Sequence, residues 1–306
     1  RRNQKLIEVA PSPSLSESLR ARIIEAAKQL ATAARYDNLG TFEFLVDDEA
    51  GEGEGAFAFI EANPRLQVEH TVTEAVLGVD LVRSQLAVAA GATLASLGLA
   101  QSAVPLPRGY AMQIRVNMEV MDEKGLTKPT GGTLSVFDLP SGPGVRVDTF
   151  GYSGYRTSAA FDSLLAKVIV HSPSPKWTDV VHKAARTLRE FRIGGVATNI
   201  PLLGAILVHQ SFARNKISTN FIDTHVAALV GAAKEHAAPL LEVSEAAATK
   251  AVVIEAAPEG SLPVPAPLQG TIVAIEVAEG DLVRPGQQIA VLESMKMEHL
   301  VAAPHG

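Results

Sequence analysis

Alternation of apolar and polar residues predicts a short β-hairpin in the first quarter of the chain. Residues 41–46 and 57–63 both have strand character, and the acidic, glycine-rich stretch between them is typical of a turn. Because successive side chains on a strand point to opposite faces, Glu61 and Asn63 share a face with Phe59. A strand whose apolar face ends in a carboxylate and an amide is expected to present polar groups to a site.

Apolar residues at helical spacing predict helices in four other places. Ser14 and Glu17 form a capping box at the start of the first helix. Asp80 caps the second helix, and Gly91 ends it. The predicted helices cover approximately residues 14–34, 80–91, 174–194 and 201–210.

The clearest alternation in the chain lies at residues 110–119, where apolar residues such as Ile114 alternate with a polar row that includes Gln113 and Arg115. Taken alone, this polar row is most simply the solvent-facing side of a strand. Further short strands are predicted at residues 133–137, 145–149 and 164–170. Together these segments predict an α+β domain in which helices pack on a mostly antiparallel sheet.

The composition changes beyond residue 225. An Ala-, Glu- and Pro-rich stretch has the character of a flexible linker, and it is followed by short Val/Ile strands separated by turns. Lys296 stands between two methionines, at the expected tip of a hairpin in this small β module. An ordinary surface lysine is the simplest interpretation, but two exposed methionines beside it weigh against that interpretation. The predicted divisions are a domain at 1–225, a linker at 226–263 and a β module at 264–306.

Charge and composition exclude several classes of protein. A net charge of -6 argues against nucleic-acid binding, and no apolar run is long enough to predict a membrane span. The chain has no cysteine, which fits a reducing compartment, so we predict a cytoplasmic protein. Its first residues resemble neither a start nor a signal peptide, and we expect it to be part of a longer polypeptide.

The hairpin places Glu43 on one strand and Glu61 on the other. If both carboxylates face the same side, they offer the oxygen ligands that Mg²⁺ shares with phosphates and water. An acidic pair that faces solvent is the alternative, because carboxylates are mostly exposed. Spacing alone leaves both interpretations open.

Several segments together resemble the biotin-dependent carboxylases. GTFEF at 40–44, FIEANPRLQVEHTVTEAVLGVDLV at 59–82, YAMQIRVN at 110–117 and FDSLLAKV at 161–168 are similar to the C-terminal part of the biotin carboxylase domain, and ESMKM at 293–297 is similar to the biotin attachment motif. The resemblance implies the C-terminal subdomain of an ATP-grasp enzyme, followed by a flexible tether and the N-terminal half of an all-β, hammerhead-like biotinyl carrier domain.

In that family ATP activates bicarbonate as carboxyphosphate, and CO2 then passes to N1 of biotin. Carried over by motif, the resemblance implies that Mg²⁺ or Mn²⁺ on the ATP phosphates is held by Glu43, Glu61 and Asn63. It implies that bicarbonate is bound by Lys5, Arg65, Gln67 and the backbone of Val68, that Glu69 is the general base, that Arg115 stabilises the biotin enolate and that Lys296 carries biotin.

The leading functional hypothesis is a part of an acyl-CoA carboxylase. The linker is too short to house a further interaction domain, which favours a short-tether architecture with the carboxyltransferase on another chain or further downstream. Pyruvate or urea carboxylase, carbamoyl-phosphate synthesis and a non-catalytic biotinylated carrier are the alternatives. The expected partners are ATP, bicarbonate, biotin, a carboxyltransferase domain or subunit, biotin protein ligase and further copies in an oligomer. We expect the Gly-rich lid loop of an ATP-grasp enzyme to be missing from this chain, and we therefore expect the chain alone to be inactive.

Overall fold

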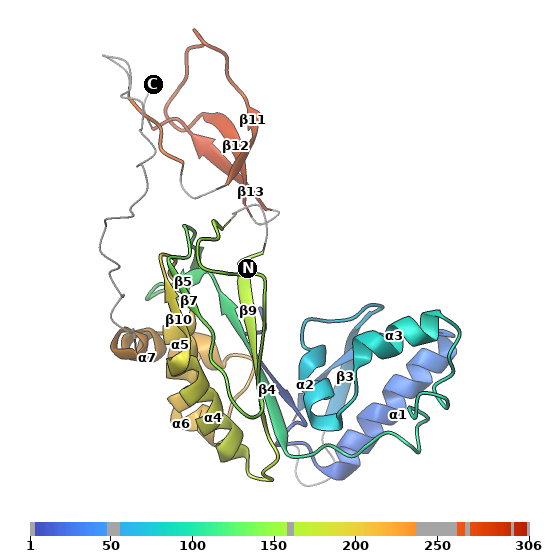
Figure 1. Ribbon diagram of the computed structural model, residues 1–306. Helices are drawn as coiled ribbons and strands as arrows, with labels where there is room; N and C mark the ends of the chain where they lie inside the picture. The colour runs from blue at the N-terminus through green and yellow to red at the C-terminus, as the bar shows by residue number, and fades with distance from the viewer. Residues whose placement is uncertain are drawn as a thin grey trace.

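The computed structural model describes residues 4–47, 56–157, 162–236, 262–266, 270–294 and 297–304 (Figure 1). Its helices are α1 (Glu17–Ala33), α2 (His70–Leu77), α3 (Leu81–Ala89), α4 (Trp177–Glu190), α5 (Ile200–Val208), α6 (Gln210–Ala213) and α7 (Phe221–His236). Its strands are β1 (Ile7–Ala10), β2 (Thr41–Asp47), β3 (Ala56–Asn63), β4 (Tyr110–Asn117), β5 (Glu119–Met121), β6 (Thr127–Pro129), β7 (Val136–Asp138), β8 (Val145–Thr149), β9 (Leu164–Ser172), β10 (Arg192–Gly194), β11 (Thr271–Ile275), β12 (Gln288–Ser294) and β13 (Met297–Ala302). Within the described residues, no helix is both long and apolar enough to cross a membrane.

The centre of the fold is a four-stranded antiparallel sheet in the order β1-β4-β9-β8. The register places Glu8 of β1 beside Gln113 of β4, and Arg115 of β4 beside Lys167 of β9. Helices α4 and α5 lie on one side of this sheet and α2 on the other (Figure 1). The predicted class, an antiparallel sheet packed by helices, is confirmed.

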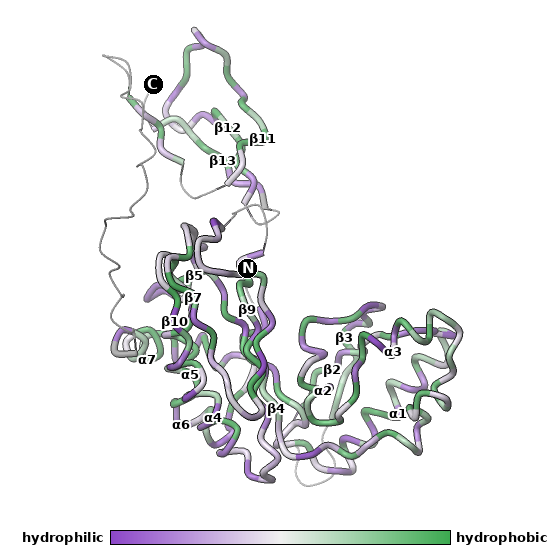
Figure 2. Tube along the Cα trace, viewed as in Figure 1, coloured by the Kyte–Doolittle hydropathy of each residue, from purple (hydrophilic) through white to green (hydrophobic). Residues whose placement is uncertain are grey.

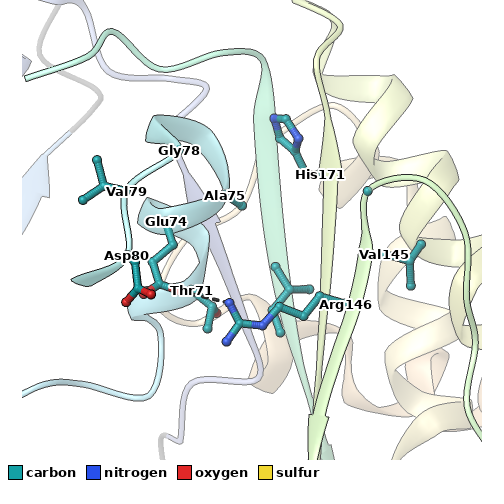
Figure 3. A pocket seen from close by; sticks show the side chains of 11 residues that line it. Thr71, Glu74, Ala75, Gly78, Val79, Asp80, Val145, Arg146 and His171 are labelled. Carbon is teal, nitrogen blue, oxygen red and sulfur yellow. Dashed lines mark hydrogen bonds and ion pairs between the residues drawn. The ribbon is translucent and has the colours of Figure 1, made fainter. Parts of the chain in front are cut away.

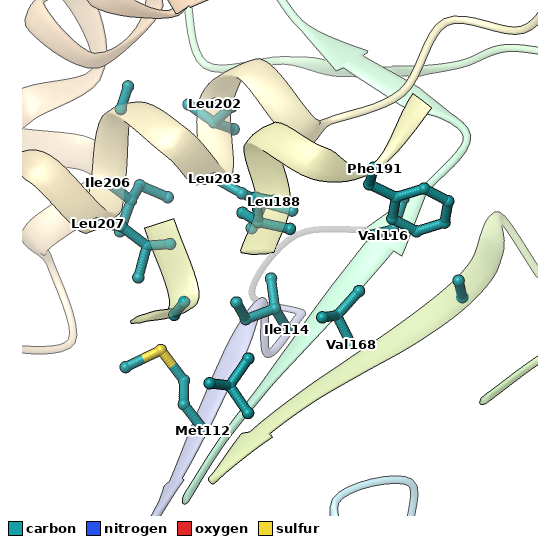
Figure 4. Packing of buried hydrophobic residues seen from close by; sticks show 14 of the residues in the cluster. Met112, Ile114, Val116, Val168, Leu188, Phe191, Leu202, Leu203, Ile206 and Leu207 are labelled. Atoms are coloured by element: carbon teal, nitrogen blue, oxygen red, sulfur yellow. The ribbon is translucent and has the colours of Figure 1, made fainter. Parts of the chain in front are cut away.

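Strand β4 separates two differently filled layers. Met112, Ile114 and Val116 point into the main hydrophobic core, where they meet Leu188 of α4 and Leu203 of α5 (Figure 4). Side chains at alternate positions point to the opposite face of a strand, and there Ala111 packs with α2. The apolar alternation at residues 110–119 therefore predicted the core face correctly.

The solvent-facing interpretation of the polar row on β4 is wrong. Gln113 is 0% exposed and Asn117 is 2% exposed. Helix α2 covers Gln113, and Thr71 in the first turn of this helix donates a hydrogen bond to the Gln113 amide oxygen. Asn199 bonds the backbone of β4 on either side, accepting from the Asn117 N–H at 2.8 Å and donating to the Arg115 carbonyl at 3.1 Å. The row is thus an internal polar layer in which both ends of the Gln113 amide are hydrogen-bonded, whereas the buried amide oxygen of Asn117 has no partner among the described residues.

The predicted hairpin is formed by β2 and β3, and Glu43 lies directly opposite Glu61. A β-bulge between Glu43 and Phe44 interrupts the pairing, so that strict alternation does not continue past this point. Phe44 contacts both Phe57 and Phe59 edge-on, with ring centroids 5.7 and 5.8 Å apart. Helix α3 mixes apolar and polar residues along its length (Figure 2) and buries none of them.

Helix α1 begins at Glu17, and its cap is Ser16 and not the predicted Ser14. The Ser16 hydroxyl accepts a hydrogen bond from the Leu19 N–H at 3.2 Å. We expect Ser16→Ala to lower the free energy of unfolding by about 1 kcal/mol, because the substitution leaves a first-turn N–H without its acceptor. Ser14→Ala is the matched control and should change it by less than about 0.5 kcal/mol. Urea unfolding of both variants measures the difference, and equal losses would contradict the cap at Ser16.

The C-terminal part of the chain differs from its predicted character at one point. Helix α7 continues past residue 225 to His236, and its Leu229 and Val230 are buried in the domain, so the first eleven residues of the predicted linker, 226–236, are helical. Strands β11, β12 and β13 form an antiparallel sheet in which Ser294 pairs with Met297. Lys296 lies outside the described residues, and the bounds of the three predicted divisions stay predictions.

Candidate functional site

The segment between β3 and α2 brings its side chains into the space between the hairpin and the four-stranded sheet. The chain turns directly after β3, where the Arg65 N–H bonds the Asn63 carbonyl at 2.8 Å. Glu69 is the residue before the first turn of α2, yet its side chain makes no capping hydrogen bond to the helix. Its carboxylate is therefore free to face the side chains of β1 and β4.

Carboxylates and cations alternate across this space. The Lys5 ammonium lies 3.2 Å from Glu43 and 2.6 Å from Glu69. The other oxygen of Glu69 accepts from the Arg115 guanidinium at 3.1 Å, and Arg115 also bonds Glu8. We call this row of Glu43, Lys5, Glu69, Arg115 and Glu8 the charge chain. It connects the hairpin, the start of α2 and two strands of the sheet.

The pKa values within the charge chain follow from its geometry. Burial disfavours the charge on Lys5, but the Glu69 and Glu43 carboxylates outweigh it and hold the pKa of Lys5 above its ordinary value. A hydrogen bond from Gln67, with further help from Lys5, holds the pKa of Glu43 below its ordinary value against the effect of burial. Burial raises the pKa of Glu8, and Arg115 offsets only part of this increase. Lys5 and Glu43 thus stay charged over a wider pH range than they would in water.

A second cluster joins the charge chain at Glu43. The Asn63 amide donates to Glu61 at 2.8 Å and to Glu43 at 3.2 Å, which confirms that the two carboxylates share one face of the hairpin. Gln67 donates to Glu43 at 2.9 Å, while its own amide oxygen is buried and has no hydrogen-bond partner among the described residues. That oxygen is an acceptor available to a bound group with an O–H or N–H.

The hairpin carboxylates fit the donor set of a hard divalent cation. Glu43 and Glu61 supply two carboxylate groups, and Mg²⁺ in nucleotide sites takes its remaining ligands from phosphates and water. In the described part of the chain, no group of three or more His, Cys, Asp and Glu side chains could hold a metal ion without such help. The donor set therefore suits a cation that arrives with a phosphate ligand.

Two of the predicted site residues, Arg65 and Val68, belong neither to the charge chain nor to the second cluster around Glu43. The Arg65 side chain is exposed and donates to the Leu66 carbonyl at 3.4 Å. The Val68 carbonyl accepts from Lys167 of β9 at 3.4 Å, and Lys167 also pairs with Asp148 at 3.2 Å. Lys167 and Asp148 were not among the predicted site residues: Lys167 lies within the recognised segment at 161–168 and Asp148 on the strand predicted at 145–149, but neither spacing nor alternation indicates that they approach Val68.

A pocket of about 400 Å³ lies between α2 and the edge of the sheet formed by β8 and β9 (Figure 3). Arg146 crosses it, bonding Glu74 at 2.9 Å and Asp148 at 2.7 and 2.9 Å. These bonds already neutralise the arginine. Among the described residues that line this pocket, none is a predicted site residue, so the charge chain and not this pocket is the candidate site.

Three segments of the chain match known protein families. Residues 1–97 match the ATP-binding domain of the carbamoyl-phosphate synthase L chain, and residues 113–224 match the biotin carboxylase C-terminal domain. Residues 262–306 match the biotin-requiring enzymes. The charge chain draws Glu43, Lys5, Glu69 and Glu8 from the first segment and Arg115 from the second.

Individual relatives extend these matches. A pyruvate carboxylase from Aspergillus terreus is 42% identical over 76% of this chain and 19% of its own length. A biotin-dependent acyl-coenzyme A carboxylase alpha3 subunit from Mycobacterium leprae is 35% identical over 99% of this chain and 56% of its own. A solved single-chain, multi-domain long-chain acyl-CoA carboxylase is 40% identical, with a TM-score of 0.70 over 100% of this chain and 29% of its own.

The chain spans less than two thirds of the length of each of these relatives. It contains an ATP-binding segment, a biotin carboxylase C-terminal segment and a biotinyl segment in that order. The resemblance of the amino-acid motifs, the antiparallel fold and the matches therefore agree. The chain belongs to the biotin-dependent carboxylases.

Proposed function

We propose that this chain supplies one side of the centre at which biotin is carboxylated with ATP and bicarbonate. The observation that carries the proposal is the position of Glu69, which lies between Lys5 at 2.6 Å and Arg115 at 3.1 Å. Lys5 also contacts Glu43, so it links Glu69 to the second cluster. A carboxylate between two cations, next to a second acidic group, suits a reaction in which several anions meet and a proton is removed.

Glu69 is the proposed general base for the bicarbonate hydroxyl. Lys5 and Arg65 offset the negative charge that gathers when bicarbonate approaches a phosphate. The unmatched amide oxygen of Gln67 and the backbone of Val68 are the proposed contacts that orient bicarbonate. In this assignment bicarbonate binds between Lys5 and Glu69 and weakens the direct contact between these two side chains.

Glu43 and Glu61, with Asn63 beside them, are the residues that would hold Mg²⁺ or Mn²⁺. The metal, when bound with ATP, supplies positive charge to the phosphate oxygens. The lowered pKa of Glu43 supports this role, since a metal ligand must be ionised. Arg115 is the proposed partner of the biotin enolate, because a guanidinium stays charged and offers a planar fork of donors.

Acyl-CoA is the proposed class of final acceptor. The Mycobacterium leprae acyl-CoA carboxylase subunit and the long-chain acyl-CoA carboxylase match 99% and 100% of this chain, including the biotinyl segment, whereas the Aspergillus terreus pyruvate carboxylase matches 76% of it. Pyruvate is the second candidate, since that pyruvate carboxylase has the higher identity, 42% against 35%. The proposed partners are biotin protein ligase, a carboxyltransferase domain or subunit and further copies of the chain. The proposed location is the cytoplasm.

The full-length protein that contains this chain tests the proposal. After modification by biotin protein ligase, it should incorporate radiolabelled bicarbonate onto the protein in an ATP-dependent reaction. Lys296→Arg should remove the protein-bound label and the biotinyl mass together, because biotin is proposed to be attached at Lys296. Normal folding with no ATP-dependent label on the wild-type protein would reject the carboxylation proposal.

A chase with unlabelled substrates then identifies the acceptor. Acetyl-, propionyl- and long-chain acyl-CoA, pyruvate and urea are added separately to the labelled protein. We expect acyl-CoA to remove the label, and removal by pyruvate or urea alone would overturn the acyl-CoA assignment.

A further inference from the structure

Glu8 is a buried carboxylate whose two oxygens are both engaged. It lies on β1 and is 9% exposed. The Nε of Arg115 donates to one oxygen at 2.5 Å, and the Gln113 amide donates to the other at 3.0 Å. A buried charge needs such partners, because desolvation is costly when the charge is unpaired. Two residues of β4 therefore hold the Glu8 carboxylate in position, and Glu8 in turn restricts the orientation of the Arg115 side chain.

Gln113 connects this carboxylate to α2. Its amide oxygen accepts from the Thr71 hydroxyl, and Thr71 is 1% exposed in the first turn of the helix. Glu69 directly precedes that turn and bonds Arg115. Hydrogen bonds thus connect Arg115 to Glu8, Glu8 to Gln113, and Gln113 to Thr71 in α2. Glu69, just before α2, bonds Arg115 and so closes the loop. The arginine is held inside a closed loop of contacts from three elements.

Such a loop fixes the plane of the guanidinium. An arginine has five N–H donors in a rigid fork, and Glu8 engages the Nε and Nη2 edge while Glu69 engages Nη2. Two bonds in different directions leave the side chain little freedom to rotate. The donors that remain on the fork have a defined direction.

We propose that Glu8 is a positioning residue that aims Arg115 at its substrate, with Gln113 and Thr71 holding Glu8 in place. This inference rests on the proposed role of Arg115 at the biotin enolate. Glu8 itself touches no reacting atom in this assignment. A small misdirection of a charged group at the reacting centre can cost about 100-fold in rate, so the effect of Glu8 should appear in the biotin-dependent step.

The test compares two reactions of the full-length enzyme carrying Glu8→Gln. Gln has nearly the same shape but no charge, so Arg115 keeps its space and its contact with Glu69 but loses the ionic contact with residue 8. We expect biotin-dependent ATP cleavage to fall about 100-fold in kcat, with the KM for ATP unchanged. Bicarbonate-dependent ATP cleavage without biotin should stay within about twofold, because it does not use Arg115. Glu25→Gln, on the exposed face of α1, is the matched control.

An equal loss in both reactions, or no loss in either, would overturn the positioning role. Glu8→Asp serves if Glu8→Gln does not fold, since it keeps the charge but withdraws it from Arg115, and the same selective loss is expected. An NMR spectrum of the arginine Nε–H groups tests the contact without any activity. The Arg115 signal, assigned with Arg115→Lys, should shift and exchange faster in Glu8→Gln. An unshifted signal would reject the inference, whereas a wild-type enzyme without biotin-dependent turnover would reject only the proposed function.

Discussion

Replacing Glu69 by Gln in the full-length protein should reduce bicarbonate-dependent ATP cleavage and biotin carboxylation by about 10²- to 10⁴-fold in kcat, the range typical of a lost general base. The amide keeps the shape of the side chain but cannot accept the bicarbonate proton. Lys5 retains Glu43 and Arg115 retains Glu8, so both cations keep a carboxylate partner and the variant should fold. Steady-state kinetics with varied bicarbonate measures the effect.

The matched control for this experiment is Glu190→Gln. Glu190 lies on the exposed side of α4, where it pairs with Arg186 at 3.5 Å, and its loss should leave the kinetics unchanged. Wild-type rates in Glu69→Gln would remove the general-base assignment. They would instead favour a non-catalytic biotinylated carrier, in which Lys296 is modified while the charge chain takes no part in turnover.

Leu203→Ala should lower the free energy of unfolding of the chain by about 2–5 kcal/mol. Leu203 is 0% exposed and lies where α5 meets the apolar face of β4. Truncation removes its buried surface and leaves a cavity that the two helices flanking it cannot fill without moving. Chemical unfolding followed by circular dichroism measures the change.

Leu106→Ala is the comparison for the core variant. Leu106 is 83% exposed, so the same chemical change removes little buried surface and should cost less than about 0.5 kcal/mol. Similar losses in the two variants would mean that α5 does not pack on β4 in the way described.

Local patterns predicted the parts of the site that lie on one hairpin. The acidic, glycine-rich stretch between two alternating segments predicted a hairpin with Glu43 on one strand and Glu61 on the other, but it left the register open, and the structure shows that the two residues lie opposite each other. The same reasoning failed for the β4 polar row. Whether Gln113 meets water depends on α2, which lies about forty residues earlier in the chain and approaches only in the folded protein.

Other differences have equally local causes. Four serines, at positions 12, 14, 16 and 18, lie around the start of α1. The capping box at Ser14 depends on Glu17 three residues later, but Glu17 is the first residue of the helix, so the cap is the residue before it. Glu8 lies on the four-residue strand β1, which is too short for alternation to reveal its face. The end of α7 is rich in Ala, so composition resembles a linker, but Leu229 and Val230 anchor it in the core.

The two-layered arrangement of β4 has a consequence for folding. If β4 slipped by one residue against β1 and β9, Arg115 would turn into the apolar core and Val116 would face Glu8 and Glu69. That state would bury an unpaired cation and leave Glu8 without its cationic partner, at a cost of several kcal/mol for each buried charge, which is a large part of the total stability of most domains. The same register of β4 therefore fixes the strand pairing and the position of Arg115. Once this sheet has folded correctly, Arg115 faces Glu8 and Glu69.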